Sequence, residues 1–392
     1  MQCACRVLQG GLVTIPEEYR GREQTYLKHQ VLRKYLSRWG YKLASAGRHQ
    51  HHRLWYVDCF AGPWKSRSAR IDDTSVSIGL AVLNEVLEEW QGRGARVSAE
   101  AVFVEADPKS FDALKEHVDE HAGAVRAHVL PGEFGSNVEE IRRLLGDDAA
   151  FVFVDPTGWK GVGMRHIARL VDRPFRDVMI NVMYEHINRF KAEERRTWLR
   201  EQLCDFFGIE DNAQLRDLDE EALLRAYRNQ LKTMSGLRYA LELAVPHPTQ
   251  DRTYFHLVAG GRHRDVVSLF RDVEAAVVGG EAAEVRESAR RRKDEASSGQ
   301  LGFDLGGAAT EDLRYRRLRD DGLEAAREIV LEELGRGVQR FEDLWPHVLE
   351  GAHITRSNLG SLIKKMRDES LLIIEGMGPR ERTIKDEHTL RL

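Results

Sequence analysis

Three short apolar runs in this chain end in an acidic residue that is followed almost at once by a turn. Residues 56–58, 101–105 and 151–155 end in Asp58, Glu105 and Asp155, and glycine or proline follows each within a few positions. Aromatic and β-branched runs bounded by such residues are typical of buried strands. In open α/β sheets, ligands bind beyond the carboxyl ends of the strands. The three acids therefore predict a site for a nucleoside-bearing cofactor at one edge of a sheet.

Strand and helix patterns alternate over most of the chain. Apolar spacing predicts an amphipathic helix over residues 26–39, and later helices begin at Thr74 or Ser75 and at Pro108. Strands are predicted at 54–58, 101–105, 124–130, 149–154, 177–182, 239–245 and 253–259. This alternation predicts an α/β fold with a mostly parallel, Rossmann-like sheet covered by helices on both faces.

A change of composition divides the chain near residue 281. We expect an N-terminal extension at 1–21, the Rossmann-like domain at 22–280, a basic and then glycine-rich linker at 281–317, and a last domain at 318–392. Helices at 323–334, 339–348 and 355–369, followed by strands at 371–375 and 381–385, have the outline of a winged helix-turn-helix. The length of 392 residues suits two domains.

Charge and hydropathy exclude several classes of protein. With 59 basic and 63 acidic residues, the net charge of −4 does not indicate a globally basic nucleic-acid binder. No stretch approaches the roughly 18 apolar residues needed to cross a bilayer, and no signal peptide is visible, so we expect a cytoplasmic protein. The cysteines Cys3, Cys5, Cys59 and Cys204 lack a matching second pair, and we expect no metal site.

The cofactor side of the predicted site follows the first three strands. Gly62 lets the backbone turn sharply under a ligand after Asp58, and an acid in the position of Glu105 accepts hydrogen bonds from ribose hydroxyls. Asp107 is a competing acid, but in Asp-Pro it suits the cap of the next helix. Glu133 is placed to read an adenine edge, or lies in a solvent-facing turn. The predicted cofactor contacts are Asp58, Phe60, Ala61, Gly62, Glu105, Ala106 and Glu133.

The acceptor side follows the strand that ends before Asp155. A carboxylate leaving a wholly apolar strand is suited to hold or deprotonate an amine or hydroxyl, so Asp155 is the predicted catalytic residue; the alternative is a structural cap. The predicted substrate contacts are Pro156, Gly158, Trp159, Asn181 and Arg189. Since Gly62 and Glu105 lie further apart than the about 20 residues usual in dinucleotide folds, the spacing counts against a dinucleotide.

Basic residues concentrate in the predicted recognition helix and wing. Recognition helices place such side chains against phosphates and base edges, which predicts contact with DNA or RNA. Acids nearby dilute the patch, and a protein-contact role is the alternative. The predicted nucleic-acid contacts are Arg356, Lys364, Lys365, Arg367 and Arg382.

The chain resembles the three-Cys-motif partner family, bacterial proteins with a class I S-adenosylmethionine-dependent methyltransferase-like core. The matching runs are residues 26–29, 35–36, 56–63, 104–107, 153–159 and 178–182. The resemblance implies S-adenosylmethionine as cofactor, contacts at Asp58, Gly62 and Glu105, an acceptor-side role for Asp155, and a radical S-adenosylmethionine protein as partner. Trp64 departs from the family, which has a small residue there, and this affects the fit of the methionine end.

These observations together predict an S-adenosylmethionine-dependent methyltransferase acting on nucleic acid delivered by the winged helix. Two alternatives stay open. One is a methyltransferase for a peptide or small metabolite, working as the partner of a radical S-adenosylmethionine protein. The other is a catalytically silent regulator that binds S-adenosylmethionine.

Overall fold

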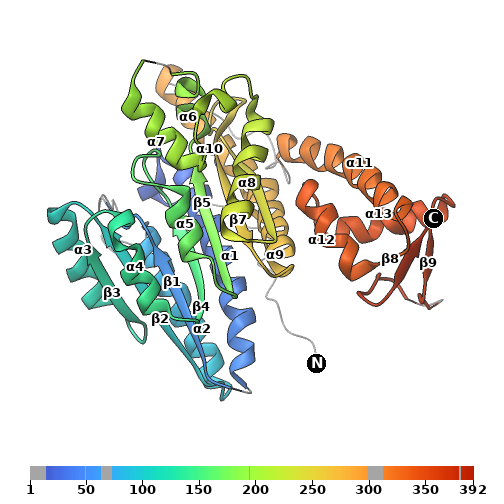
Figure 1. Ribbon diagram of the computed structural model, residues 1–392, viewed down its shortest axis with the longest axis horizontal. Coiled ribbons are helices and arrows are strands. Elements are labelled where there is room, and N and C mark those ends of the chain that lie inside the picture. Colours follow the sequence, from blue (N-terminus) through green and yellow to red (C-terminus); the bar gives the residue numbers. More distant parts are fainter. Residues whose placement is uncertain (1–14, 49, 63–72, 194, 299–311, 379–380) are drawn as a thin grey trace.

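Seven strands form one twisted sheet in the computed structural model, which describes residues 15–48, 50–62, 73–193, 195–298, 312–378 and 381–392 (Figure 1). The strand order is β3-β2-β1-β4-β5-β7-β6. The first five strands in this order are parallel, whereas β7 runs antiparallel to both β5 and β6. The strands are β1 His52–Asp58, β2 Val97–Glu105, β3 Arg126–Pro131, β4 Ala149–Val154, β5 Arg176–Val182, β6 Tyr239–Pro246 and β7 Thr253–Gly261. The predicted Rossmann-like α/β sheet is confirmed.

Helices cover both faces of this sheet because alternate strand residues point to opposite sides. Leu54 and Tyr56 of β1 belong to one apolar cluster, and Trp55 and Val57 belong to the other. The first face carries α1 Glu23–Ala44, α2 Ser75–Gly92, α3 Pro108–His121 and α9 Asp265–Glu274. The second carries α4 Phe134–Leu145, α5 Met164–Leu170, α6 Tyr184–Phe190, α7 Thr197–Phe207 and α8 Glu220–Ser235.

Local capping fixes where two of these helices begin. The Thr74 hydroxyl accepts a hydrogen bond from the Ser77 amide at 3.2 Å at the start of α2. Asp107 accepts one from the Ser110 amide at 2.8 Å, and Pro108 occupies the first turn of α3. Both caps satisfy amides that a helix start leaves unpaired. The predicted start of α2 and the capping role of Asp107 are confirmed.

Much of the stretch predicted as a linker is helical. A π-helix over Ala275–Glu281 continues from α9 into α10, Ala282–Ser298. Ala282 and Val285 are fully buried against the first face of the sheet domain. Residues 299–311 lie outside the described residues. The basic run at 290–293 lies within this helix, and the buried small and apolar residues on its other side hold α10 to the fold.

Three helices and a small antiparallel sheet make up the C-terminal unit, as we call residues 312–392. They are α11 Leu313–Gly335, α12 Phe341–Gly351 and α13 Arg356–Asp368, with β8 Gln339–Arg340, β9 Ile373–Glu375 and β10 Thr389–Arg391. The sheet order is β8-β10-β9. The predicted return strand at 381–385 is wrong. There the Gly378 amide donates to Glu381 and the Lys385 amide to His388, at 2.9 and 3.1 Å, and these turns move the strand to β10.

The C-terminal unit packs on the sheet domain beside α8 and α9 (Figure 1) through a buried polar group that we call the junction network, formed by Glu242, Arg271, Glu274 and His353. Arg271 and Glu274 are each 1% exposed and pair at 2.8 Å. Arg271 Nε also donates to the Leu349 carbonyl of α12 at 2.9 Å. The junction is therefore continuous with the core.

Within the described residues, no helix is both long and apolar enough to cross a membrane.

Candidate functional site

The ends of β1, β2 and β4 bring the three predicted acids to one edge of the sheet. Asp58 lies opposite Phe103 of β2 and Phe153 of β4, so Glu105 and Asp155 both extend just beyond it on either side. Backbone hydrogen bonds from Cys59 to Phe153 at 3.0 Å and from Ala61 to Val104 at 2.9 Å tie the loop after β1 to both neighbours. The chain order reverses across β1 and β4, which is where ligands bind in such sheets.

Asp58 is fully buried beneath this edge. Its Oδ1 accepts the Phe60 amide at 3.2 Å, and the Tyr56 hydroxyl donates to Oδ2 at 3.4 Å. Burial raises the pKa of Asp58 to about 6, and these hydrogen bonds oppose that rise. The carboxyl therefore shapes the loop that leads to Gly62, from within the fold.

Glu105 and Gly62 lie in direct contact. Glu105 Oε1 accepts the Asp107 amide at 2.6 Å, which orients the carboxylate. A Cβ on residue 62 would stand 1.6 Å from Glu105 Oε2, so only glycine allows the acid to take this position. The Glu105 carboxylate therefore lies directly against the backbone of the loop after β1. In nucleotide-binding α/β folds, an acid in this place accepts hydrogen bonds from ribose hydroxyls.

A cavity of about 450 Å³ opens at the same edge. It brings together six of the residues predicted from the sequence, namely Phe60, Ala61, Gly62, Asp155, Pro156 and Asn181. The other lining residues come from the start of α1, the start of α2, the loops after β4 and β5, and β7. They are Arg22, Gln24, Thr25, Lys28, His29, Asp73, Thr74, Ser75, Thr157, Met183, Tyr254 and Phe255. We call it the strand-end cavity.

Asp155 is held from two sides within this cavity. Asn181 Nδ2 donates to its Oδ1 at 2.8 Å, and Lys28 Nζ forms an ion pair with its Oδ2. Because a carboxylate only accepts, the first contact fixes the orientation of the Asn181 amide. Asn181 Oδ1 is then buried without a hydrogen-bond partner among the described residues. The ring of Phe255 lies 5.7 Å from Lys28 Nζ.

A second set of charges lies on the α1 side of the cavity. Arg22 pairs with the buried Asp73 at 2.5 Å. Burial lowers the pKa of His29 to about 3, and the neighbouring charge of Lys28 acts in the same direction. His29 is therefore neutral, and the Tyr19 hydroxyl contacts its Nδ1 at 2.9 Å. The cavity thus presents fixed charges of both signs.

The remaining predicted contacts do not line the strand-end cavity; among them, Asp58 is fully buried and Glu105 is 7% exposed beside Gly62. Ala106 and Glu133 are exposed just after β2 and β3, and Arg189 is exposed on α6. Gly158 follows the β4 loop, and Trp159 is buried in the second apolar cluster, with its ring 5.8 Å from that of Phe190. Trp159 therefore packs as a core residue. Trp64, the departure from the family pattern, lies outside the described residues.

Sequence reasoning missed the contribution of α1 and β7 to the cavity. Lys28 and Arg22 were not assigned a role, and neither was Phe255. The one available signal was the run at 26–29, which was used only for the family resemblance. A cation on the polar side of an amphipathic helix is usually solvated, so only the packing of α1 shows that it meets Asp155.

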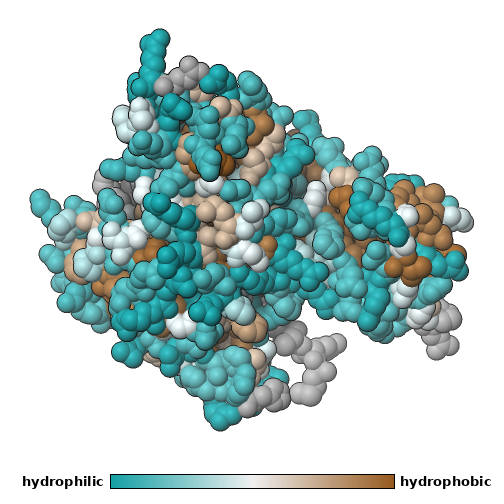
Figure 2. All heavy atoms as spheres, viewed as in Figure 1, coloured by the Kyte–Doolittle hydropathy of each residue, from teal (hydrophilic) through white to brown (hydrophobic). Residues whose placement is uncertain are grey.

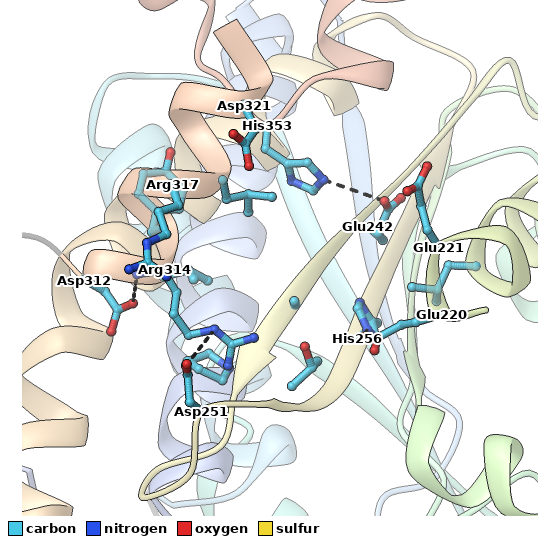
Figure 3. A pocket seen from close by; sticks show the side chains of 17 residues that line it. Glu220, Glu221, Glu242, Asp251, His256, Asp312, Arg314, Arg317, Asp321 and His353 are labelled. Atoms are coloured by element: carbon cyan, nitrogen blue, oxygen red, sulfur yellow. Dashed lines mark hydrogen bonds and ion pairs between the residues drawn. The ribbon is translucent and has the colours of Figure 1, made fainter. Parts of the chain in front are cut away.

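A second cavity of about 470 Å³ lies between β6, β7, α8 and α11, away from the predicted site (Figure 3). Figure 3 shows His353 directed at Glu242 and Arg314 directed at Asp251. His256 also lines it and contacts Glu220 at 2.7 Å. The pairs of His353 with Glu242 and of Arg314 with Asp251 cross the junction of the sheet domain and the C-terminal unit.

The five basic residues predicted to contact nucleic acid mostly have partners within the C-terminal unit. Arg356 pairs with Asp386 and lies 4.8 Å from the ring centre of Trp345. Lys364 Nζ donates to the Arg382 carbonyl at 2.8 Å. Lys365 pairs with Glu369 just after α13, and Arg367 pairs with Asp368 at the end of α13. The Arg382 side chain is exposed.

No group of three or more histidine, cysteine or acidic side chains that is suited to a metal occurs in the part of the chain that the structure describes. Cys3 and Cys5 lie outside that part. Cys59 is buried, and Cys204 is half-buried.

Comparisons with known proteins give no family model and no curated protein that matches. Among solved structures, the chain is similar to loganic acid methyltransferase with SAH, at 11% identity over 77% of this chain and 95% of that one, with a TM-score of 0.33. It is similar to an O-methyltransferase from Bacillus cereus in complex with SAH, at 10% identity, 57% and 80% coverage and a TM-score of 0.29. It is also similar to the O-methyltransferase TomG from Streptomyces achromogenes in complex with SAM, at 14% identity over 57% of this chain and 79% of that one, with a TM-score of 0.28. At these TM-scores the likenesses carry no argument about what this chain binds.

Proposed function

We propose that this chain is an S-adenosylmethionine-dependent methyltransferase whose reaction takes place in the strand-end cavity. The observation that carries the proposal is the contact of Glu105 with the bare Cα of Gly62 on one side of β1, with Asp155 in the cavity on the other side. The acid expected to hold the nucleoside and the acid expected to face the methyl acceptor thus lie on either side of the end of β1. The strand order also places both acids at the point where the chain order of the parallel strands reverses, which is where ligands bind in such sheets.

The residues present fit the cofactor. Glu105 would hold the ribose hydroxyls through Oε2, because Oε1 is already engaged by the Asp107 amide. The methionine end carries an ammonium and a carboxylate, and the cavity offers the opposite charges of Arg22 and Asp73. When bound, the cofactor supplies a methyl group activated by a positively charged sulfur.

The chain contributes positioning and a proton acceptor. Asn181 and Lys28 hold the Asp155 carboxylate in one orientation, so that an acceptor amine or hydroxyl can give its proton to it. Pro156 and Phe255 add apolar wall to the cavity beside that contact. Most of the acceleration would come from holding the acceptor in line with the methyl group.

The identity of the acceptor stays a prediction. A winged-helix role for the C-terminal unit is supported by its three helices and the antiparallel sheet order β8-β10-β9. Nucleic acid as acceptor has less support, since four of the five basic side chains named above have partners within the unit. Figure 2 shows hydrophobic side chains over this unit, and its exposed residues include Val338, Ile373 and Leu392. Those residues favour a protein-contact role.

Membership of the three-Cys-motif partner family, and a radical S-adenosylmethionine protein as partner, also stay predictions from the resemblance. The same holds for a cytoplasmic location.

Calorimetry with S-adenosylmethionine tests the proposal. We expect saturable binding to the wild type and a loss of about 10- to 100-fold in affinity for Glu105→Ala, because hydrogen bonds to a charged group contribute about 1.5–3 kcal/mol. Glu116→Ala removes the same charge from the exposed side of α3 and is the matched control. Absence of binding to the wild type would contradict the methyltransferase reading. Equal affinity of the wild type and Glu105→Ala would contradict the ribose assignment.

A further inference from the structure

Lys28 supplies the cation that fills the acceptor side of the strand-end cavity. It reaches the cavity from the first turns of α1, and its side chain is 13% exposed. Nζ pairs with Asp155 and lies 5.7 Å from the centre of the Phe255 ring. A carboxylate and an aromatic face together are a favourable setting for an ammonium group. The residue that we assign as proton acceptor thus already holds an amine of the same chain.

We propose that Lys28 is itself a methyl acceptor, modified at Nζ by the site of its own chain. This inference rests on the proposed function, because it uses S-adenosylmethionine bound at Glu105 and Gly62 as methyl donor. It assigns the chemical class of acceptor as a primary aliphatic amine. An ordinary structural ion pair would leave Lys28 unmodified.

The step balances with the groups on hand. The Lys28 ammonium gives one proton to the Asp155 carboxylate and becomes a neutral amine. Its nitrogen lone pair forms the new N–C bond as the S–C bond of the donor breaks, and that electron pair stays with sulfur in the neutral thioether product. Asp155 then releases the proton to water, and the methylated ammonium, which is still charged, pairs again with the carboxylate.

Lys34 provides an internal comparison. It lies on α1 as well and pairs with Glu281 at 3.0 Å, but it does not line the cavity. Both lysines are therefore ion-paired amines on one helix, and they differ in access to the strand-end cavity. General reactivity toward the donor would mark Lys34 at least as readily, since its side chain is 35% exposed against 13% for Lys28.

The experiment incubates the purified full chain with methyl-labelled S-adenosylmethionine and follows the label at each lysine by peptide mapping. We expect Lys28 to be labelled about 100-fold faster than Lys34 or more, because holding the amine beside the donor makes the step unimolecular. The first-order rate constant should not depend on protein concentration. A rate constant that grows with protein concentration would show transfer between chains and overturn the proposal.

Four variants test whether the label depends on the Lys28 amine, on the Asp155 carboxylate and on binding of the donor. Lys28→Arg should lose the label, and Lys34→Arg should keep it. Asp155→Asn should bind the donor in calorimetry but label Lys28 about 100-fold more slowly, as expected for loss of a general base. Glu105→Ala should lose donor binding and label together. A wild type that binds the donor and leaves Lys28 unlabelled overturns this inference alone. A wild type that does not bind the donor overturns the proposed function as well.

Discussion

Asp58 is a fully buried carboxyl, and burial raises its pKa from the ordinary value near 4 to about 6. The folded chain therefore binds this proton more tightly than the unfolded chain. Stability from this group is full below about pH 4 and is lost as the pH rises through 6. A shift of about two pKa units corresponds to about 3 kcal/mol.

The substitution Asp58→Asn removes the titrating carboxyl and keeps the size and shape of the side chain. We expect the free energy of unfolding of the variant, relative to the wild type, to rise by about 3 kcal/mol between pH 4 and pH 7. Urea unfolding without cofactor at four pH values measures this difference. Asp112→Asn, at an exposed position of α3, is the control and should show no such trend. A constant difference for Asp58→Asn would mean that the buried carboxyl does not titrate in this range.

Gly62 tests the contact that carries the proposed function. In Gly62→Ala the new Cβ would stand 1.6 Å from Glu105 Oε2, so the carboxylate must move. We expect about 1–3 kcal/mol of destabilisation, as for other overpacked sites. Adding Glu105→Ala should restore most of that loss, since the clashing atoms are gone. Gly92→Ala, with nothing within 4 Å, is the control. Lack of rescue in the double variant would place the strain elsewhere.

At the level of single residues, local patterns predicted the site residues that follow the strands but not the site residues on segments distant in the sequence. Asp58, Glu105 and Asp155 were found because each directly follows an apolar run. Lys28 was missed because its meeting with Asp155 depends on how α1 packs, at a separation of 127 residues. Trp159 was placed in the cavity from its position after a turn, whereas apolar neighbours bury it.

Among the elements, those with a strong period were predictable and those fixed by tertiary contacts were not. All seven strands of the main sheet followed from apolar runs and turn residues. The strand at β10 was predicted too early, because buried His388 accepts the Lys385 amide and anchors a turn where the strand was expected. The π-helix before α10 was not predicted; within it Gly279 lies against the Tyr315 ring of α11, where a Cβ would stand 2.6 Å from the ring.

The start of α13 depends on a capping box. The Thr355 hydroxyl accepts the Asn358 amide at 3.2 Å, and the Asn358 side chain accepts the Thr355 amide at 3.1 Å. We expect Thr355→Ala to cost about 1 kcal/mol of stability, while Thr355→Ser keeps the hydroxyl and most of that stability. Thermal and urea unfolding of both variants measure the difference. Equal losses for alanine and serine would show that the methyl group, and not the cap, matters at this position.

Across the whole molecule, the junction network joins the C-terminal unit to the sheet domain through charges instead of apolar contacts alone. Burial alone would lower the pKa of His353, but the Glu274 and Glu242 carboxylates together outweigh it and the pKa is raised. Burial would likewise raise the pKa of Glu242, yet His353 and Arg228 lower it to about 2. A protonated His353 thus lies between two ionised carboxylates, at 2.7 Å from Glu274 and 3.7 Å from Glu242.

The junction should therefore weaken in alkaline solution. Because the folded-state pKa of His353 lies above its unfolded value, its stabilisation is full below about pH 6.5 and is lost as the pH rises through the raised value. We expect hydrogen exchange in α12, corrected for the intrinsic rate, to quicken from pH 6 to pH 9 in the wild type. His353→Gln should exchange fast throughout, because losing one partner of a buried ionic group costs about 3 kcal/mol. Amides of β1 and β2, far from the junction, are the internal control. If α12 keeps the same protection across this range, the histidine does not hold the unit in place, and the apolar contacts of α12 with α9 and β6 would suffice.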